Sequence, residues 1–265
     1  MLRIATWNIN SVRLRVRLVT RFLDAYTPDV LCLQEIKCRN DAFPAAPFKK
    51  RGYSHLAING QKGYHGVAIV SRVPLADISI RGFCSKDDAR HIAASVATPH
   101  GAVRIHNFYV PAGGDEPDPA ANEKFAHKLA FVAEMRHWLA ARAIAEPSVL
   151  LGDLNIAPLE HDVWSHRQLL KVVSHTPLEV EGLEGLRTGG GWTDVARHFV
   201  PHNEKLYTWW SYRALDWEAA DRGRRLDHIW VTGPLVPHLD GIEIVRQARG
   251  WKRPSDHVPV IASIR

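Results

Sequence analysis

The sequence predicts an α/β fold in which mixed β-sheets are covered by helices, and three observations support this prediction. Short apolar runs repeatedly begin or end at a carboxylate, an amide or an imidazole, as strands do where they reach the rim of a sheet. Segments with apolar residues at helical spacing alternate with these runs. Strands that occur both in hairpins and in crossovers favour mixed sheets with helices over their faces.

Five apolar runs carry polar residues at one end. They are Ile4 to Trp7 before Asn8, Val30 to Leu33 before Glu35, Val149 to Leu151 before Asp153 and Asn155, Leu226 to Val231 around Asp227, and Val258 to Ile264 after Asp256 and His257. If these runs are strands whose polar ends meet at one rim, carboxylate and amide oxygens converge with a histidine in one cleft. That combination of groups suits a hard cation and a phosphate.

An amphipathic helix is expected directly after the first strand. Its apolar residues recur at helical spacing at Leu14, Leu18, Phe22 and Ala25. Ser11 is positioned to cap the start of this helix, and Pro28 ends it because proline cannot continue a helix. A strand and a helix therefore open the chain.

The middle of the chain predicts a buried strand, a hairpin and a long helix. The strand covers Val67 to Val70, and the hairpin pairs His91 to Ala97 with Ala102 to Val110 across the turn at 98–101. The helix has apolar positions from Phe125 to Leu139 and leads into the next strand.

Length and composition predict one soluble domain spanning residues 1–265. Hydrophobic residues make up 46% of the chain, which is enough to build one core of this size. No Pro-rich or Ser/Gly-rich linker divides the sequence, and no apolar stretch approaches the length of a membrane span. A strand-like run follows Met1 at once and leaves no room for a signal peptide, while three cysteines without metal-ligand spacing favour a reducing compartment. We therefore expect a cytoplasmic protein.

The basic charge balance, a formal net charge of +6, favours a polyanionic partner. The basic clusters are Arg13, Arg15, Arg17 and Arg21; Lys49, Lys50 and Arg51; Arg222, Arg224 and Arg225; and Arg246, Arg249, Lys252 and Arg253. Each cluster alone is typical of a solvated surface. Together with a phosphate site they fit the backbone of a nucleic acid.

The strongest local pattern is Leu151-Gly152-Asp153-Leu154-Asn155. Side chains alternate along an extended chain, so Asp153 and Asn155 point to one side while Leu154 points into the core. Gly152 allows backbone or ligand to approach closely. Taken alone, the pattern is also typical of a turn at the end of a strand.

Two further groups predict a metal and phosphate site. Glu35 is the candidate main ligand of Mg²⁺, which prefers one or two carboxylates, although an exposed strand-end carboxylate is equally common. Asn8 can donate to a neighbouring carboxylate or complete the outer shell of the metal; the alternative is a turn residue. An imidazole held by a buried carboxylate is suited to grip a phosphate oxygen, but the sequence alone does not show that His257 pairs with Asp227, and a histidine buried in the core is the favoured alternative at this point.

Five short motifs, in order along nearly the whole chain, resemble those of one enzyme family. They are Thr6-Trp7-Asn8, Leu33-Gln34-Glu35, Gly152-Asp153-Leu154-Asn155, Arg225-Leu226-Asp227 and Ser255-Asp256-His257. The ordered set is similar to the exonuclease III family of DNA-repair nucleases, within the endonuclease/exonuclease/phosphatase superfamily. The resemblance implies a four-layer α/β sandwich, with two mixed β-sheets packed face to face and helices on the outside.

The resemblance also implies an activity and its partners. The expected enzyme is a Mg²⁺-dependent phosphodiesterase, with Mn²⁺ as a possible substitute, that hydrolyses duplex DNA at abasic sites. It also implies removal of 3′ blocking groups and of nucleotides in the 3′ to 5′ direction, by in-line attack of water and without a covalent intermediate. The family default is a monomer.

The family roles fall on individual residues of this sequence. Glu35 matches the metal carboxylate, Asn8 the supporting amide and Asp256 a second or alternative metal contact. Asp153 matches the residue that orients or deprotonates water, or protonates the leaving oxygen. The remaining matches are Asn155 and Tyr109, which contact the scissile phosphate, and Asp227 with His257, whose imidazole stabilises the pentacoordinate phosphorane.

The segment Thr208 to Arg213 is similar to the family's aromatic pocket for a flipped-out abasic sugar. Trp209 and Leu226 are the candidate walls of this apolar pocket, whereas Trp210 is expected in the core. Arg90 matches an arginine near the DNA backbone. A loop contact to DNA is in doubt at Ala112, and the segment 159–191 either probes or obstructs DNA.

Two other functions fit parts of the sequence. One is a phosphoesterase of the same superfamily that acts on a non-DNA ester, such as an inositol phosphate or a lipid headgroup. The other is a DNA-binding module without catalysis, which is disfavoured because every matched position holds a competent residue.

Overall fold

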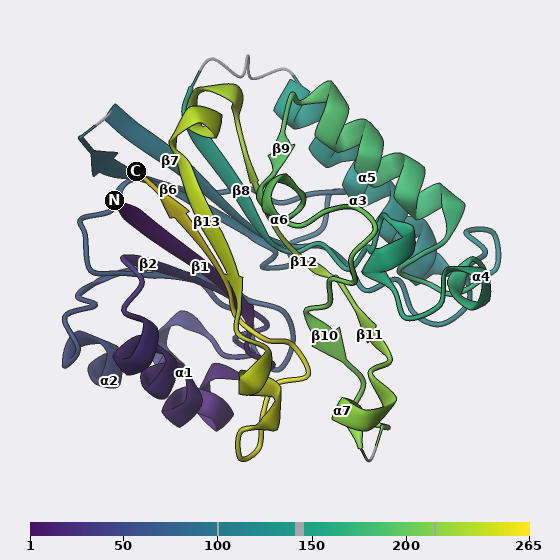
Figure 1. The fold of residues 1–265 in the computed structure, drawn as a ribbon. Helices are drawn as coiled ribbons and strands as arrows, with labels where there is room; N and C mark the ends of the chain where they lie inside the picture. Colours follow the sequence, from purple (N-terminus) through teal and green to yellow (C-terminus); the bar gives the residue numbers. More distant parts are fainter. Residues whose placement is uncertain (100, 141–145, 215) are drawn as a thin grey trace.

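The computed structural model describes residues 1–99, 101–140, 146–214 and 216–265. Two six-stranded sheets pack face to face, and helices cover their outer faces (Figure 1). The predicted four-layer α/β sandwich with mixed sheets is confirmed.

The first sheet has the strand order β13-β14-β1-β2-β4-β3. Its strands are β1 (Leu2–Asn8), β2 (Val30–Gln34), β3 (His55–Asn59), β4 (Val67–Ser71), β13 (Leu239–Ile244) and β14 (Val260–Ile264). β1 and β2 are parallel, while the other neighbours are antiparallel. The predicted strands at the start, middle and end of the chain therefore meet in one sheet.

The second sheet has the strand order β5-β6-β7-β8-β12-β9. Its strands are β5 (Ala76–Ile80), β6 (His91–Thr98), β7 (Gly101–Tyr109), β8 (Ser148–Asp153), β9 (Thr193–Asp194) and β12 (Asp227–Val231). β6 and β7 form the predicted hairpin, whose turn residue His100 lies outside the described residues. A short ribbon of β10 (Trp209–Trp210) and β11 (Gly223–Arg224) lies beside the sheets.

Helices cover both outer faces of the sandwich. The α-helices are α1 (Val12–Tyr26), α2 (Ala45–Lys49), α3 (Glu123–Ala140), α4 (His166–Leu169), α5 (Pro177–Gly189), α6 (Val195–Phe199) and α7 (Trp217–Ala220), and the 3-10 helices are η1 (Asn40–Ala42), η2 (Glu160–Asp162), η3 (Gly233–His238) and η4 (Arg246–Gly250). Helices α1 and α2 lie on the first sheet, and α3 and α5 on the second (Figure 1). None of the helices within the described ranges has both the length and the apolarity of a membrane span.

The central strands, such as β2, β4, β8 and β12, are buried on both faces, which explains why they read as continuous apolar runs. Along β8, Val149 and Leu151 face the other sheet, whereas Leu150 packs under α3 and α5. In β1, Ile4 lies between the sheets and Trp7 packs under α1. Alternation on each strand thus supplies two apolar layers at once.

The first helix ends as predicted but begins differently. Thr27 adopts a left-handed C-cap conformation directly before Pro28. Ser11 occupies the N-cap position, but its φ is +84° and its side chain makes no capping hydrogen bond, so the predicted cap is wrong. The backbone N–H of Ser11 instead donates to the carbonyl oxygen of Glu35 at 2.7 Å. The start of α1 is therefore set by the turn that follows β2.

The polar ends of the strands converge at one rim of the sandwich, as predicted. Asn8 is opposite Gln34 where β1 and β2 end, and Tyr109 is opposite Asp153 where β7 and β8 end. Asp227, at the start of the antiparallel strand β12, is the direct partner of Asp153. Carboxylates far apart in sequence are thus brought together by strand register.

Gly152 lets two neighbouring strands approach closely. Its φ is +137°, and a Cβ atom there would collide with the carbonyl oxygen of Phe108 on β7. The close approach expected at Gly152 is therefore made by the backbone of β7. It keeps the following residue, Asp153, directly opposite Tyr109 on that strand.

We expect Gly152→Ala to lower the free energy of unfolding by about 2 kcal/mol or more, because a side chain adds both a clash and backbone strain. Gly233→Ala is the matched control, since a Cβ at Gly233 meets no atom within 4 Å. Urea unfolding followed by circular dichroism measures both variants. Equal stability of the two variants would show that the contact at Gly152 is not restrictive.

Candidate active site

The rim where the strands end borders a cleft of about 660 Å³. Its lining includes the predicted site residues Glu35, Tyr109, Asn155, Trp209, Leu226, Asp256 and His257. Three other predicted residues, Asn8, Asp153 and Asp227, are buried and hydrogen-bond to one another or to lining residues. The structure thus brings together all but one of the predicted residues, the exception being Arg90.

Asn8 connects the two carboxylates at the base of the site. Its Nδ2 donates to Glu35 Oε1 at 2.9 Å and to Asp153 Oδ2 at 2.8 Å. Its Oδ1 accepts from the backbone N–H of Asn10 at 3.0 Å. The Tyr109 hydroxyl donates to the same Glu35 oxygen at 2.9 Å. Asn8 therefore adopts the donating arrangement, with its side-chain oxygen turned to the backbone.

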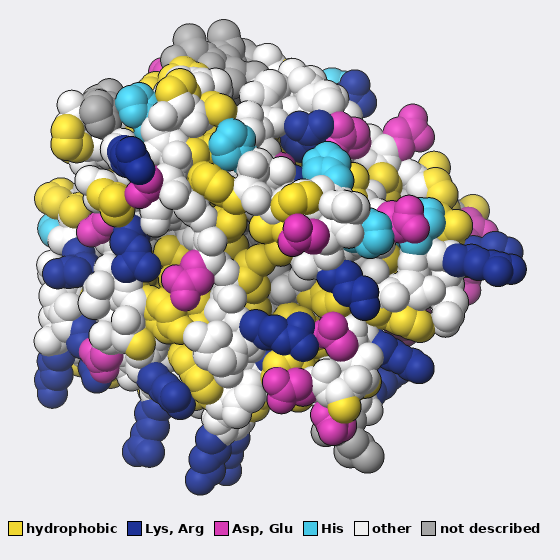
Figure 2. All heavy atoms as spheres, viewed as in Figure 1, with side chains coloured by type: hydrophobic (Ala, Val, Ile, Leu, Met, Phe, Trp, Pro, Cys, Tyr) yellow, Lys and Arg dark blue, Asp and Glu magenta, His cyan; other side chains and the backbone are white. Residues whose placement is uncertain are grey.

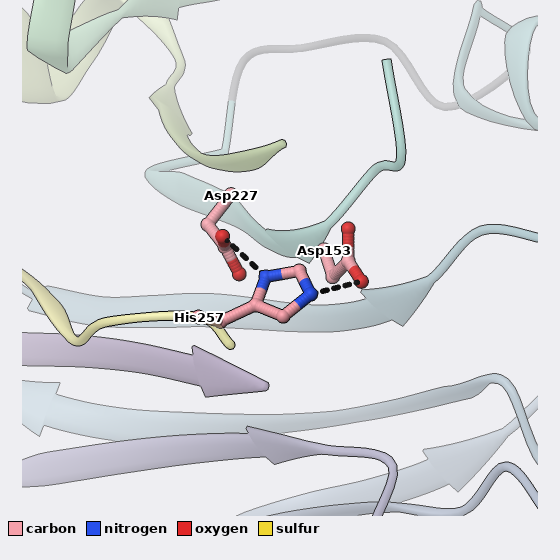
Figure 3. A group of neighbouring side chains, drawn as sticks. All are labelled: Asp153, Asp227 and His257. Atoms are coloured by element: carbon pink, nitrogen blue, oxygen red, sulfur yellow. Dashed lines mark hydrogen bonds and ion pairs between the residues drawn. The ribbon is translucent and has the colours of Figure 1, made fainter. Parts of the chain in front are cut away.

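His257 lies between two aspartates, as Figure 3 shows. Its Nδ1 is 2.8 Å from Asp227 Oδ2, and its Nε2 is 3.7 Å from Asp153 Oδ2. Burial alone would lower the pKa of His257, but the charges of Asp227 and Asp153 outweigh it and raise that pKa well above its ordinary value. The imidazolium form is therefore favoured at neutral pH.

The position of Asp227 is fixed by Thr208. The Thr208 hydroxyl donates to Asp227 Oδ2 at 2.6 Å and accepts from the backbone N–H groups of Leu226 and Asp227 at 3.0 and 3.1 Å. Trp7 Nε1 holds the carbonyl oxygen of His257 at 3.0 Å. Both members of the carboxylate–imidazole pair are thus held by neighbours before any substrate binds.

Asp153 is almost completely buried. Burial raises the pKa of this carboxyl, His257 opposes the shift, and Asp227 adds to it. Asn8 Nδ2 and the backbone N–H of Asn155 hold its two oxygens. A carboxyl group with a raised pKa is suited to exchange a proton with water or with a leaving oxygen.

Glu35 sits in a turn with unusual backbone geometry, at a φ of +49°. This left-handed conformation is strained for a non-glycine residue, and the residue that adopts it lines the cleft. Burial would raise the pKa of Glu35, but the Lys37 ammonium at 2.7 Å and the hydrogen bond from Asn8 lower it overall. Glu35 is therefore an ionised oxygen donor facing the cleft.

Asn155 is a second site residue in the left-handed region, at a φ of +54°. Its Nδ2 donates to the carbonyl oxygen of Val110 at 2.9 Å and lies 3.2 Å from Asp153 Oδ2. The ammonium of Lys128 on α3 donates to the Asn155 carbonyl at 2.8 Å and forms a fully buried ion pair with Glu179 on α5. Both outer helices therefore hold this turn.

Asp256 lies in the cleft and is held by two donors. Asn10 Nδ2 reaches its Oδ1 at 3.1 Å, and Trp209 Nε1 reaches its Oδ2 at 3.0 Å. Burial would raise the pKa of Asp256, but His257 and these hydrogen bonds lower it. Lys37 also donates to Asn10 at 2.7 Å, which links Asp256 to Glu35 through two side chains.

Two groups of side chains offer ligands to a metal ion. Asp153, Asp227 and His257 present one ligand atom each within 4.8 Å of one another, and Asp227 Oδ1 is buried without a hydrogen-bond partner among the described residues. However, an imidazolium cannot coordinate a metal. The ionised carboxylates of Glu35 and Asp256 line the cleft and supply the oxygen ligands that a hard cation prefers. The residues around Glu35 therefore fit a divalent cation better.

Arg90 lies outside the cleft lining and is only 6% exposed. It forms an ion pair with Asp88, and its guanidinium lies over the Tyr109 ring at 5.0 Å. The Arg90 carbonyl accepts from the Tyr109 N–H at 2.8 Å. The structure thus places Arg90 behind Tyr109, and a contact with DNA remains a prediction.

The aromatic segment divides between cleft and core. Trp209 and Leu226 line the cleft, whereas Trp210 is buried against Tyr207 and Trp217, as expected. Ala112 also lines it, as do four residues of the segment 159–191, namely Trp164, Val172, Val173 and Ser174. This part of the segment therefore forms cleft surface.

Several side-chain contacts that support the site were not predicted from the sequence. They are Lys37 beside Glu35, Thr208 beneath Asp227, and the buried ion pairs of Asp162 with Arg197 and Arg225. The closeness of Lys37 to Glu35 in sequence was the one available signal. The others depend on contacts between distant strands, which no local pattern reveals.

Comparisons with known proteins agree with this geometry. The model of the endonuclease/exonuclease/phosphatase family matches residues 5–257. Exodeoxyribonuclease III of Haemophilus influenzae is 31% identical over 274 residues, which cover 100% of both chains. The structure of an AP endonuclease from Archaeoglobus fulgidus is similar at a TM-score of 0.91 and 34% identity, covering 100% of this chain and 99% of that one. The 3′ phosphatase NExo from Neisseria, bound to a product DNA hairpin, has a TM-score of 0.90 and 33% identity over 100% of both chains.

We expect Asp227→Asn to lower the pKa of His257, because the substitution removes the nearer of the two charges that stabilise the imidazolium. Imidazole nitrogen shifts followed by NMR between pH 5 and about 10 measure this change. Asp240→Asn, which removes a carboxylate paired with Arg265, is the control. An unchanged titration of His257 in Asp227→Asn would reject the electrostatic pairing.

Proposed function

The chain belongs to the endonuclease/exonuclease/phosphatase family, and from this premise we propose that it is a DNA-repair phosphodiesterase of the exonuclease III type. It is a metal-dependent hydrolase that cleaves phosphodiester bonds of DNA at abasic sites and at 3′ ends. The observation that carries this proposal is the placement of His257 between Asp227 and Asp153, beside the carboxylate of Glu35.

Each polar residue around the scissile phosphate has its own role in hydrolysis. Negative charge grows on the non-bridging phosphate oxygens as water attacks phosphorus, and the His257 imidazolium is positioned to stabilise it. Asp227 keeps the imidazole protonated and oriented. The Tyr109 hydroxyl and the Asn155 amide lie at the same cleft and can hold the scissile phosphate.

Asp153 orients the attacking water and transfers protons during the reaction. Its oxygens lie beside His257 Nε2 and Asn8 Nδ2, so a water in line with the scissile bond can be oriented by the carboxylate. The raised pKa of Asp153 also allows it to return a proton to the leaving 3′ oxygen. No serine or cysteine nucleophile is required, and the reaction is a single displacement by water.

Glu35 and Asp256 would hold the divalent cation, with Asn8 orienting Glu35 through its amide. When bound, the metal supplies positive charge that neutralises phosphate oxygens. Mg²⁺ is the proposed ion because the available ligands are carboxylate oxygens, and Mn²⁺ is a possible substitute.

The finer features of this function are also proposals. The substrate is duplex DNA containing an abasic site or a 3′ end, the protein acts as a monomer, and it works in the cytoplasm. Basic side chains suit the DNA backbone: Figure 2 shows Lys and Arg projecting at the lower left of the viewed face, where Figure 1 places α1 and α2. If duplex DNA fails to compete for the cleft, a phosphoesterase of the same family with a non-DNA substrate becomes the better assignment.

Asp153→Asn and His257→Ala should each lower kcat/KM by roughly two to four orders of magnitude, because each removes a proton-transfer or charge-stabilising group. The assay is cleavage of a labelled duplex with one abasic analogue, in Mg²⁺ and in chelator. Asp240→Asn, at a residue outside the cleft lining that pairs with Arg265, serves as the control. Unchanged turnover in either site variant would reject its assigned role.

Glu35→Gln should raise the Mg²⁺ concentration needed for half-maximal rate by about tenfold or more, since the metal loses its main anionic ligand. Mn²⁺ binding followed by electron paramagnetic resonance should weaken in parallel, which separates binding from turnover. Glu134→Gln, which removes a surface carboxylate paired with Arg81, controls for a general loss of charge. Equal metal dependence of the two variants would place the metal elsewhere.

A further inference from the structure

A guanidinium lies in the cleft wall that sequence reasoning predicted to be apolar. Arg224 on β11 pairs with Trp209 on β10, and its guanidinium carbon lies 5.2 Å from the centre of the Trp209 ring. Arg224, Trp209 and Leu226 all line the cleft that holds the site. The wall therefore combines an aromatic face, an aliphatic side chain and a cation.

The charge of Arg224 is only weakly compensated by the protein. Its Nη1 donates to the Val173 carbonyl at 3.0 Å and to the Ser174 hydroxyl at 2.7 Å, both neutral acceptors. Its Nε is buried and has no hydrogen-bond partner among the described residues. Burial lowers the pKa of Arg224, and within the described chain only the carboxylate of Glu179 counteracts this. Glu179 is itself paired with Lys128.

A partly buried cation of this kind favours an anion from outside the protein. A guanidinium binds carboxylate or phosphate oxygens through paired N–H donors, more strongly than it binds neutral oxygen. The contacts to Val173 and Ser174 fix the side chain in advance, so little conformational entropy is lost when a ligand binds. Arg224 is thus prepared for a negatively charged group.

The position of Arg224 links it to the reacting phosphate. Trp209 pairs with Arg224 and also forms an isolated bridge with His257. Leu226 directly precedes Asp227, the partner of His257. A phosphate bound at His257 therefore shares one cleft with the wall formed by Arg224, Trp209 and Leu226.

The DNA substrates of the proposed enzyme differ in the charge of the group that is joined to the reacting phosphate. At an internal abasic site the phosphate is followed by a neutral deoxyribose. A 3′-phosphate end carries an additional ionised oxygen instead, and a 3′-phosphoglycolate end carries a carboxylate. Only the last two present an anion to the guanidinium.

We propose that Arg224 makes this wall an anion-binding subsite that selects DNA 3′ ends bearing a terminal phosphate or phosphoglycolate over an internal abasic nucleotide. The inference rests on the proposed function. For the 3′-phosphate, water forms a new bond to phosphorus while the bond between phosphorus and the 3′ oxygen breaks. The 3′ oxygen leaves with the bonding electron pair and takes up a proton, giving a 3′-hydroxyl and inorganic phosphate.

The test compares kcat/KM on three duplexes, with a 3′-phosphate, a 3′-phosphoglycolate and an internal tetrahydrofuran abasic analogue. Arg224→Leu should lower the ratio of either blocked-end rate to the abasic rate by about tenfold or more, the loss expected for one charge-assisted contact. Arg224→Lys keeps the charge but loses the paired N–H donors and the stacking on Trp209, so its ratio should fall between those of the parent and of Arg224→Leu. Arg222→Leu is the matched control, because Arg222 also lines the cleft but lies over Trp164. It should lower all three rates by a similar factor.

The outcomes separate the two proposals. A ratio in Arg224→Leu within about threefold of the parent, or an equal change in Arg222→Leu, overturns the subsite. A loss on the 3′-phosphate alone or on the phosphoglycolate alone assigns the subsite to that one group. A parent that cleaves none of the duplexes rejects the proposed function itself.

A binding measurement covers the case in which Arg224→Leu fails to fold. In chelator, the parent should bind the 3′-phosphate duplex about tenfold more tightly than the same duplex with a 3′-hydroxyl, as followed by fluorescence anisotropy. Equal affinity for the two ends would overturn the subsite without any variant.

Discussion

The whole site depends on hydrogen bonds that join the two sheets at one rim. Asn8 of the first sheet donates to Asp153 of the second, and Tyr109 of the second sheet donates to Glu35 after β2. Deeper in the interface, the buried Gln34 amide donates to Asn107 at 2.7 Å. Buried polar groups are costly unless they are paired, so these contacts fix how the sheets align. Apolar packing alone would allow more than one alignment.

The same hydrogen-bonded rim also sets the arrangement of charges in the cleft. Carboxylates from different strands are held close together by register, and their mutual repulsion is offset by a shared amide, an imidazolium and an ammonium. The residues that carry this arrangement also show the strain expected of a functional site. Glu35 and Asn155 both adopt left-handed backbone conformations. The stability of the sandwich therefore maintains a geometry that is locally unfavourable.

Much of this was predictable from sequence because strand ends are local features. The apolar runs before Asn8, Glu35 and Asp153 identified the rim, and the ordered motifs identified the fold. The helix cap predicted at Ser11 was wrong because the backbone N–H of Ser11 donates to the carbonyl oxygen of Glu35 instead. That contact joins segments that are distant in sequence, so no local pattern shows it. The cation in the aromatic wall was missed for the same reason. The pairing of Arg224 with Trp209 depends on a two-residue ribbon that has no periodicity.

The buried ion pair of Lys128 and Glu179 has a consequence beyond packing. It joins α3 and α5 across the outer layer, while the same ammonium holds the turn of Asn155 at the cleft. A chain in which these helices have not docked lacks the buried ammonium that holds the Asn155 carbonyl. The local geometry of the cleft at Asn155 therefore depends on the outer layer of helices being in place.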